Sequence, residues 1–491
     1  MNNAHNKRRP GLVRLKRLTK KNYRVAIRRL EPDEWQKVAE ADPEIPRSFS
    51  ELRRLGRQVF KRAGRARSQK IVRPVRGFLR PAVEECGETP ASRFFLALSN
   101  PLLSLEQLDA LDADIDADVP VFDQSLETAH FILRWTNASA NAADNIADNT
   151  IIDDTANYLE AAWVQYNPVF GAPYVAPGLT KIDVVFWDIA GLGFTTPGGP
   201  INLDAPNWVA QLGVRQPTSA HELFHRVQYA YGYRTTWTPA GAYQWFSEGS
   251  ASWGEVFVWS RVSGSYKITD LFTNPDLNLW NASYSALPFW IFFQIRQQDF
   301  AGDNAMLSFL QRYQTLGNER TAVAQIIDED WPPNNVYGQL DTFFALFARD
   351  RVLDHWRLGP SGGAYPAILA PNGVAIAPAL AVTAVPLGAG DTYVSAGVVS
   401  ALGTDYYRFA FQSGSTGHDI SLSSVVPAGG DYSYYLIWEK AGSWVRAEFP
   451  FVSSGNYSLA QTLDLSLADA LVVAISGRGL GGPYTLNASV T

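Results

Sequence analysis

The sequence predicts an α+β domain followed by an all-β sandwich. Strand-like apolar runs alternate with helical spacing from residue 128 onward. The composition then shifts toward Ala, Pro, Gly and Val at 356–384, and period-two alternation between Gly-rich turns follows. At 491 residues, of which 46% are hydrophobic, the chain is long enough for two or three folded units with separate cores.

The N-terminal segment, residues 1–80, differs in charge from the rest of the chain. It holds 24 Lys and Arg against 7 Asp and Glu, a net +17, whereas the remainder holds 18 against 41, a net −23. We interpret it as a basic N-terminal arm or propeptide that can contact an anionic surface. Charge alone is a weak indication of nucleic-acid recognition, so no specific nucleic acid is expected as a partner. Residues 81–127 are expected to form a connector.

The α+β domain is expected to span 128–355. Its strands are predicted from apolar or alternating runs, which lie at 129–135, 182–187 and 201–203. A Gly/Pro/Thr-rich segment, GLGFTTPGGP, interrupts the pattern before the last of these. Apolar spacing predicts helices at 153–166, 217–231, 243–256 and 284–297. The helix at 217–231 is expected to be capped by Thr218 or Ser219.

The C-terminal part is expected to be a linker at 356–384 and a β-sandwich at 385–491. Four segments there alternate between polar and apolar residues: DYYRFAF, DYSYYLIWE, ALVVAIS and YTLNASV. Gly-rich turns separate them, as in a small antiparallel sandwich. No stretch is long and apolar enough to predict a transmembrane segment.

Residues 221–225 read HELFH, an HExxH motif on a predicted helix. His221 and His225 are four residues apart, so both imidazoles lie on one face and can bind one ion. Glu222 lies beside that face and can act as a general base toward an attacking water. With six histidines in the chain, a chance HExxH is improbable. The motif therefore predicts a catalytic zinc site.

A catalytic zinc ion needs a third protein ligand. A third histidine six residues after His225 is absent, because Tyr231 occupies that position and Gln228 replaces the intervening glycine, which excludes a metzincin. The other histidines lack helpful spacing and are expected to be structural or exposed: His5, His130, His355 and His418. A carboxylate is the better candidate. Glu248, 23 positions after His225, and Glu255 both lie on the next predicted helix.

The pair HELFHxxQ and WxxEGxAxW resembles the gluzincin zinc metallopeptidases, and most of all proteins assigned as secreted bacterial metalloproteases. The resemblance covers about 128–296 and implies a zincin-like fold with His221, His225 and Glu248 as zinc ligands. It also implies that 201–203 is the strand at the cleft edge, where an extended peptide would pair. Glu255 remains the rival third ligand.

A zinc peptidase also needs a donor, usually a tyrosine or a histidine, that stabilises the oxyanion of the tetrahedral intermediate besides the metal. Tyr284, at the start of YSALPFWIFF, matches the position where related gluzincins carry a tyrosine. The competing residues are Tyr229, Tyr231 and Tyr233. The expected activity is zinc-dependent peptide-bond hydrolysis, with a protein or peptide as substrate.

The segment 385–491 is similar to the pre-peptidase C-terminal domain of many secreted proteases, through LGTDYYRFAF and GGPYTLNASV. This similarity implies an extracellular or cell-surface location, although no signal peptide is visible. Cys86 precedes the domain and is expected to be inert rather than a zinc-blocking thiolate. A calcium site is a further candidate, and its ligands would be Asp144, Asp148, Asp153 and Asp154. The alternative interpretation of these four residues is a solvated acidic loop that binds no ion.

Two other functions remain open. The chain can be a non-catalytic binding or assembly protein that keeps a zinc fold and acts through its basic arm and β-sandwich. Intact Glu222 counts against this, because a decayed site would lose its general base without harm to folding. The zinc site can also hydrolyse an amide bond that is not a peptide.

Overall fold

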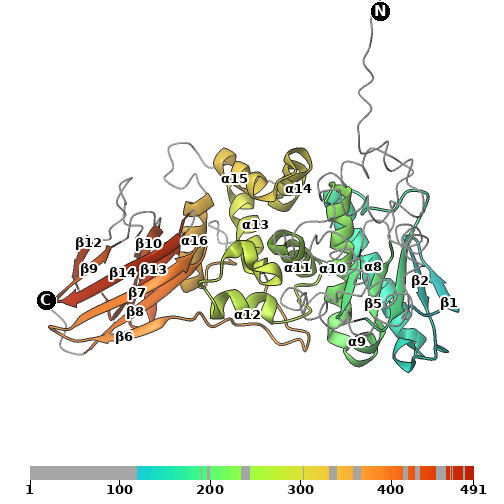
Figure 1. Ribbon diagram of the computed structural model, residues 1–491, viewed down its shortest axis with the longest axis horizontal. Coiled ribbons are helices and arrows are strands. Elements are labelled where there is room, and N and C mark those ends of the chain that lie inside the picture. Colours follow the sequence, from blue (N-terminus) through green and yellow to red (C-terminus); the bar gives the residue numbers. More distant parts are fainter. Residues whose placement is uncertain are drawn as a thin grey trace, which may run out of the picture. The chain divides into compact units, whose positions relative to one another are not determined.

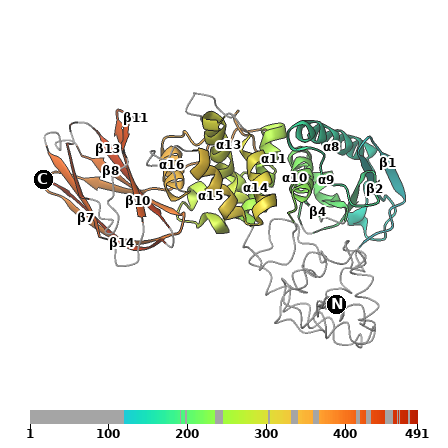
Figure 2. The same ribbon diagram turned by 90° about the horizontal axis from the view of Figure 1, so that it is seen from above.

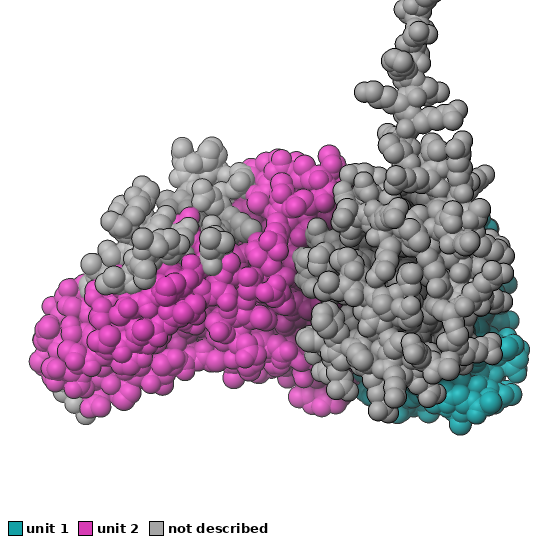
Figure 3. All heavy atoms as spheres, in the orientation of Figure 1, with its two compact units in different colours: residues 1–242 teal, residues 243–491 magenta. Residues whose placement is uncertain are grey.

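The computed structural model describes residues 119–189, 191–195, 199–233, 244–301, 304–330, 340–357, 366–412, 418–425, 432–448, 460–464, 466, 468–478 and 481–491. The basic segment 1–80, Cys86, His5 and most of the connector lie outside these residues. The chain divides into two compact units, residues 1–242 and 243–491, which are coloured separately in Figure 3.

A five-stranded sheet forms the framework of the first unit. Its order is β1 (Gln124–Glu127), β2 (Phe131–Trp135), β3 (Ile182–Trp187), β5 (Ile201–Asp204) and β4 (Gly193–Thr195). β2, β3 and β5 are parallel, and β1 and β4 pair antiparallel at the two borders. The central strand β3 reads IDVVFW, the nearly continuous apolar run expected for a parallel strand covered on both faces.

The expected place of 201–203 at the edge of the sheet is wrong. β5 contains this segment and pairs with β3 on one side and β4 on the other. Residues 193–195, within the Gly/Pro/Thr-rich segment, turn back and pair antiparallel with β5, so β4 is the border strand. The sequence obscured this strand because it has only three residues and lies among turn-forming residues.

Two long helices pack against each other beside this sheet (Figures 1 and 2): α8 (Asn149–Phe170) and α10 (Leu212–Ala230). The Asp148 side chain caps α8 by accepting a hydrogen bond from the Thr150 amide at 3.0 Å. The Tyr166 hydroxyl donates to the Ala220 carbonyl at 3.1 Å and so ties α8 to the middle of α10. The short elements η3 (Ala142–Asp144) and α9 (Ala205–Ala210) complete the described part of this unit.

The expected N-cap at Thr218 or Ser219 is also wrong, because α10 begins at Leu212 and Pro217 lies inside it. A proline removes one backbone donor, and here the helix continues through it. Thr218 and Ser219 are buried within α10. The HExxH motif therefore lies in the second half of a longer helix, held in place by packing over several preceding turns.

The helical part of the second unit contains α11 (Gln244–Trp259), α12 (Tyr266–Thr273), η4 (Leu279–Asn281), η5 (Ser283–Ala286), α13 (Leu287–Ala301), α14 (Ala305–Leu316), α15 (Glu319–Asp330) and α16 (Leu340–Val352). The helix expected at 284–297 is a 3-10 turn followed by α13. Aromatic rings fill the core, with Trp245 stacked on Trp290 at 5.1 Å between centroids and Phe289 edge-on to Phe347. None of the helices in the described parts is long and apolar enough to cross a bilayer.

The C-terminal part is a β-sandwich, as the alternation predicts. One sheet has the order β11 (Ser443–Glu448), β10 (Tyr432–Lys440), β13 (Ala470–Gly477), β8 (Thr404–Phe411) and β6 (Thr383–Leu387). The other has the order β12 (Ala460–Asp464), β9 (Asp419–Val425), β14 (Gly481–Val490) and β7 (Thr392–Ser400). Both sheets contribute to a single apolar core, which includes Leu422 and Leu486 from one sheet and Leu436 and Val473 from the other.

Candidate metal centre

The two histidines of the HExxH motif lie together on one face of α10. Their ring centroids are 4.8 Å apart and the ring planes are inclined at 82°. Both side chains are buried, with exposed fractions of 2% for His221 and 3% for His225. One helical turn separates them, so the backbone itself sets the spacing of the two imidazoles.

The orientation of His225 is fixed by Gln228, which lies three residues further along α10. Nδ1 of His225 is 2.8 Å from Oε1 of Gln228. An amide oxygen only accepts, so Nδ1 carries the proton in this arrangement and Nε2 carries the lone pair that a metal needs. Such a partner sets both the tautomer and the ring direction of a metal-binding histidine. Gln228 is the glutamine of the HELFHxxQ motif, and the sequence pattern alone gave it no task of its own.

The carboxylate of Glu222 is buried against the border strand β4. A Cβ atom placed on Gly193 would lie 3.1 Å from both Cγ and Oε1 of Glu222. Glycine at this position therefore leaves the room that the carboxylate occupies. Nothing in the sequence pattern singled out Gly193, because only the pairing of β4 with β5 brings it next to α10.

A buried arginine accompanies Glu222 on the same helix. Arg226 follows one turn later, is 1% exposed, and donates a hydrogen bond to the Gly199 carbonyl. Burial lowers the pKa of Arg226 to about 10, while Tyr229, Tyr174 and Glu222 act in the opposite direction. The guanidinium thus stays protonated at neutral pH and places a positive charge near the general-base candidate.

The third candidate ligand, Glu248, lies on α11 in the segment WFSEG. Close packing explains why the next residue, Gly249, has no side chain. A Cβ on Gly249 would lie 2.8 Å from Nε1 of Trp290 and 2.9 Å from Cβ of Ala286. Nε1 of Trp290 also donates to the Trp245 carbonyl at 2.8 Å, which fixes α13 against the first turn of α11. The helix that carries Glu248 is therefore packed tightly beside the ligand position.

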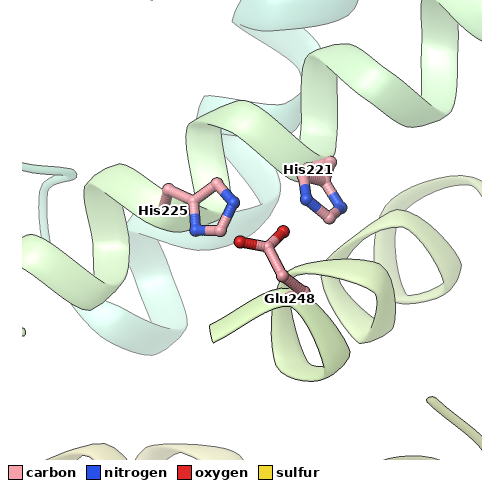
Figure 4. Close-up of side chains that lie close together, drawn as sticks. All are labelled: His221, His225 and Glu248. Atoms are coloured by element: carbon pink, nitrogen blue, oxygen red, sulfur yellow. The ribbon is translucent and has the colours of Figure 1, made fainter. Parts of the chain in front are cut away.

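His221, His225 and Glu248 form a His/His/Glu cluster. Each offers one ligand atom, and the three atoms all lie within 4.8 Å of one another. Figure 4 shows the Glu248 carboxylate directed toward both imidazole rings. Two nitrogens and a carboxylate oxygen are a donor set that suits zinc, with a fourth position left for water or substrate. The residues present therefore fit the metal that the HExxH motif predicts.

The rival ligand Glu255 has a different environment. It is fully buried, and its carboxylate accepts hydrogen bonds from the Ser263 amide at 2.8 Å, from the Ser263 hydroxyl at 3.1 Å and from the Lys267 ammonium at 2.5 Å. These donors occupy both carboxylate oxygens. Among the described residues, Glu248 and not Glu255 joins the two histidines.

The competing tyrosines near the motif make structural contacts. The Tyr229 hydroxyl donates to the Thr195 carbonyl of β4 at 2.8 Å, and the Tyr231 hydroxyl donates to the Phe170 carbonyl at the end of α8 at 2.9 Å. The Tyr233 ring stacks on Tyr229, with 6.2 Å between centroids. Tyr284 belongs to η5, a 3-10 turn in contact with α11, the helix of Glu248.

The candidate calcium ligands have local structural contacts. Asp144 accepts hydrogen bonds from the Ser139 hydroxyl at 2.7 Å and the Asp188 amide at 2.9 Å, and Asp148 caps α8. Asp154 lies 3.8 Å from Arg215, and Asp153 is exposed on α8. Within the described ranges, the only group of three or more His, Cys, Asp or Glu close enough to hold a metal is the His/His/Glu cluster.

Two histidines outside the motif also have local partners. Nδ1 of His130 lies 2.6 Å from the Glu160 carboxylate, and its ring stacks on Trp163. Nδ1 of His418 lies 3.0 Å from the carbonyl of Thr491.

Comparison with known proteins identifies no family for this chain. No family model matches it, and no curated protein matches it. Among solved structures, the pre-peptidase C-terminal domain of collagenase from Bacillus anthracis matches 23% of this chain and 97% of its own length. The identity is 16% and the TM-score is 0.17.

Proposed function

We propose that this protein is a zinc-dependent peptidase with a zincin-like catalytic domain and a sandwich of the pre-peptidase C-terminal type. The observation that carries the proposal is the His/His/Glu cluster, in which α10 supplies the two histidines of HExxH and α11 supplies Glu248. The buried carboxylate of Glu222 lies on α10 beside the two histidines. Zinc bound there would supply a Lewis acid and lower the pKa of a coordinated water toward about 7.

The residues of the chain have separate tasks in this reaction. Glu222 takes the proton of the attacking water and passes it to the nitrogen of the leaving amine, so that no proton is lost or gained overall. Gln228 holds the His225 ring in the tautomer that exposes Nε2 to the metal. Tyr284 donates a hydrogen bond to the oxygen that becomes negatively charged in the tetrahedral intermediate.

A peptide substrate is favoured by the border strand next to Glu222. β4 pairs with β5 on one side only, among the described strands, and Gly193 of β4 touches the general-base candidate. An extended peptide that pairs with a border strand gains main-chain hydrogen bonds without a requirement for one side-chain type. We therefore propose that an extended peptide binds along β4, rather than along 201–203.

The metal assignment is tested by mass-spectrometric metal content after purification and dialysis. We expect about one zinc per chain in the wild type and little in His221→Ala and Glu248→Ala. Lys267→Met/Glu255→Gln is the matched control, since it changes the other glutamate of the same helix, removes both charges of its buried ion pair together and should keep its zinc. Zinc retained in Glu248→Ala, or lost in this control, would contradict the ligand set.

The activity is tested with denatured protein and peptide libraries. The wild type should cleave them in a chelator-sensitive manner, and Glu222→Gln should bind zinc but lose at least about a hundredfold in kcat. Bound zinc without any turnover in the wild type would favour the non-catalytic binding or assembly protein. Cleavage confined to non-peptide amides would keep the zinc chemistry and change the substrate class.

A further inference from the structure

A fully buried ion pair in the second unit has no task in the reaction described so far. Nζ of Lys267 on α12 lies 2.5 Å from Oε1 of Glu255 on α11, and their side chains are 3% and 0% exposed. Two charges removed from water contribute little net stability compared with apolar residues of similar volume. A pair of this kind is therefore poorly explained by stability alone.

The ammonium of this pair also faces an aromatic ring. Nζ of Lys267 lies 4.7 Å from the centroid of the Tyr284 ring. The Tyr266 ring, one residue before Lys267, meets the Tyr284 ring edge-on at 6.2 Å. A cation over the face of a buried ring is an attractive and directional contact, and it is stronger away from water. Two consecutive residues of α12 thus fix the plane of the Tyr284 ring.

The backbone immediately before Tyr284 adopts an uncommon conformation. Ser283 has a φ of 43°, in the left-handed region that residues other than glycine seldom occupy. The cost is on the order of 1 kcal/mol and must be met by the surrounding contacts. The following residues pack tightly, because a Cβ on Gly249 would lie only 2.9 Å from Cβ of Ala286 in the same turn. Tyr284 is therefore held from its backbone as well as from its ring.

We propose that Lys267, held in place by its ion pair with Glu255, is a positioning residue for Tyr284. The pair fixes the phenol ring, and the positive charge on the ring face draws electron density from the hydroxyl and strengthens it as a hydrogen-bond donor to the oxyanion. This inference rests on the proposed function, in which Tyr284 is that donor. It also explains why the second glutamate of α11 binds a lysine rather than the metal.

The test is a double-mutant cycle on kcat in the zinc-loaded full chain. Lys267→Met alone would leave the buried carboxylate of Glu255 without its counter-charge. The cycle therefore uses Lys267→Met/Glu255→Gln, which removes both charges together. In the chain that keeps Tyr284, we expect Lys267→Met/Glu255→Gln to lower kcat about tenfold and to change KM by less than about twofold. This loss in kcat is smaller than the loss from removal of the oxyanion donor itself. In the Tyr284→Phe background, the same substitutions should change kcat by less than about twofold. An equal loss in both backgrounds would show a merely structural role and overturn the inference.

A second measurement does not require hydrolysis. 3-Fluorotyrosine placed at position 284 reports the ring environment by ¹⁹F NMR of the full chain. Its resonance should be shifted from the wild-type position in Lys267→Met/Glu255→Gln. In the separate variant Lys267→Arg, which keeps a cation beside the ring, the resonance should lie closer to the wild-type position. An unmoved resonance overturns the inference.

The two proposals fail in different ways. If the resonance shifts in Lys267→Met/Glu255→Gln but the zinc-loaded wild type has no peptidase activity, the proposed function is overturned and, with it, the catalytic part of this inference. Peptidase activity with additive losses in the cycle would overturn this inference alone.

Discussion

Nδ1 of His225 lies 2.8 Å from Oε1 of Gln228, and both side chains are buried on the same helix. The hydrogen bond links a candidate ligand to a residue that itself carries no metal chemistry. It restricts both the ring orientation and the position of the imidazole proton. The hydrogen bond thus adds Gln228 to the structural surroundings of the HExxH motif in this chain.

Gln228→Leu should weaken zinc binding. Without an acceptor, the His225 ring loses its preferred tautomer and orientation, and loss of such a partner costs about 10- to 100-fold in metal affinity. The affinity is measured by competition with a fluorescent zinc chelator. Gln228→Glu keeps an acceptor at this position and is the matched control, so equal losses in both variants would contradict the role of the hydrogen bond.

Gly193→Ala should reduce turnover without loss of zinc. The new methyl group would lie 3.1 Å from Cγ and Oε1 of Glu222, so the carboxylate has to move by a few tenths of an ångström. We expect kcat to fall about tenfold, because small displacements of a general base are costly. Steady-state kinetics and metal content are measured on the same preparation. Unchanged kcat, or zinc lost together with activity, would contradict this account.

Gly249→Ala should destabilise the helical part of the second unit. The added methyl group meets Trp290 and Ala286 below 3.0 Å, and overpacking of this kind costs about 1–3 kcal/mol. Chemical denaturation followed by tryptophan fluorescence measures the change. Gly249→Ala/Ala286→Gly removes one of the two overlaps and should recover part of the loss. If the double variant recovers none of the lost stability, overlap with Ala286 is not the cause of the destabilisation.

Stability should fall as the pH rises from about 4 to about 6 because of Asp204. Burial raises the pKa of this carboxyl to about 6, and the hydrogen bonds from the Asn207 and Ile189 amides offset only part of the shift. A folded-state pKa above the unfolded value means that the folded state binds more protons between these pH values. The stabilisation is complete below about 4 and is lost as the pH passes about 6.

Asp204→Asn removes this titration. One pKa unit corresponds to about 1.4 kcal/mol, so the effect is at most about 3 kcal/mol. The Tm of the variant relative to the wild type should increase between pH 4 and pH 6.5 and then stay constant. A Tm difference that is constant over the whole range would contradict the raised pKa of Asp204.

The sequence by itself determined the two-part fold class and the strongest site residues. Hydrophobic periodicity is a local property, so the strand β3, the helix α8 and the alternating strands of the sandwich were readable from neighbouring residues. The HExxH motif is local as well, because one helical turn brings His221 and His225 together in any α-helix. For the same reason, the helix that carries Glu248 was predictable.

Only the tertiary structure decided which distant residues meet. Sheet order depends on pairing across the chain, so the border position of β4 and the contact of Gly193 with Glu222 had no signal in the local pattern. The choice between Glu248 and Glu255 also depended on side-chain direction and on Lys267, twelve residues beyond Glu255. Periodicity records how each segment is buried, whereas packing between segments selects the partners of each side chain.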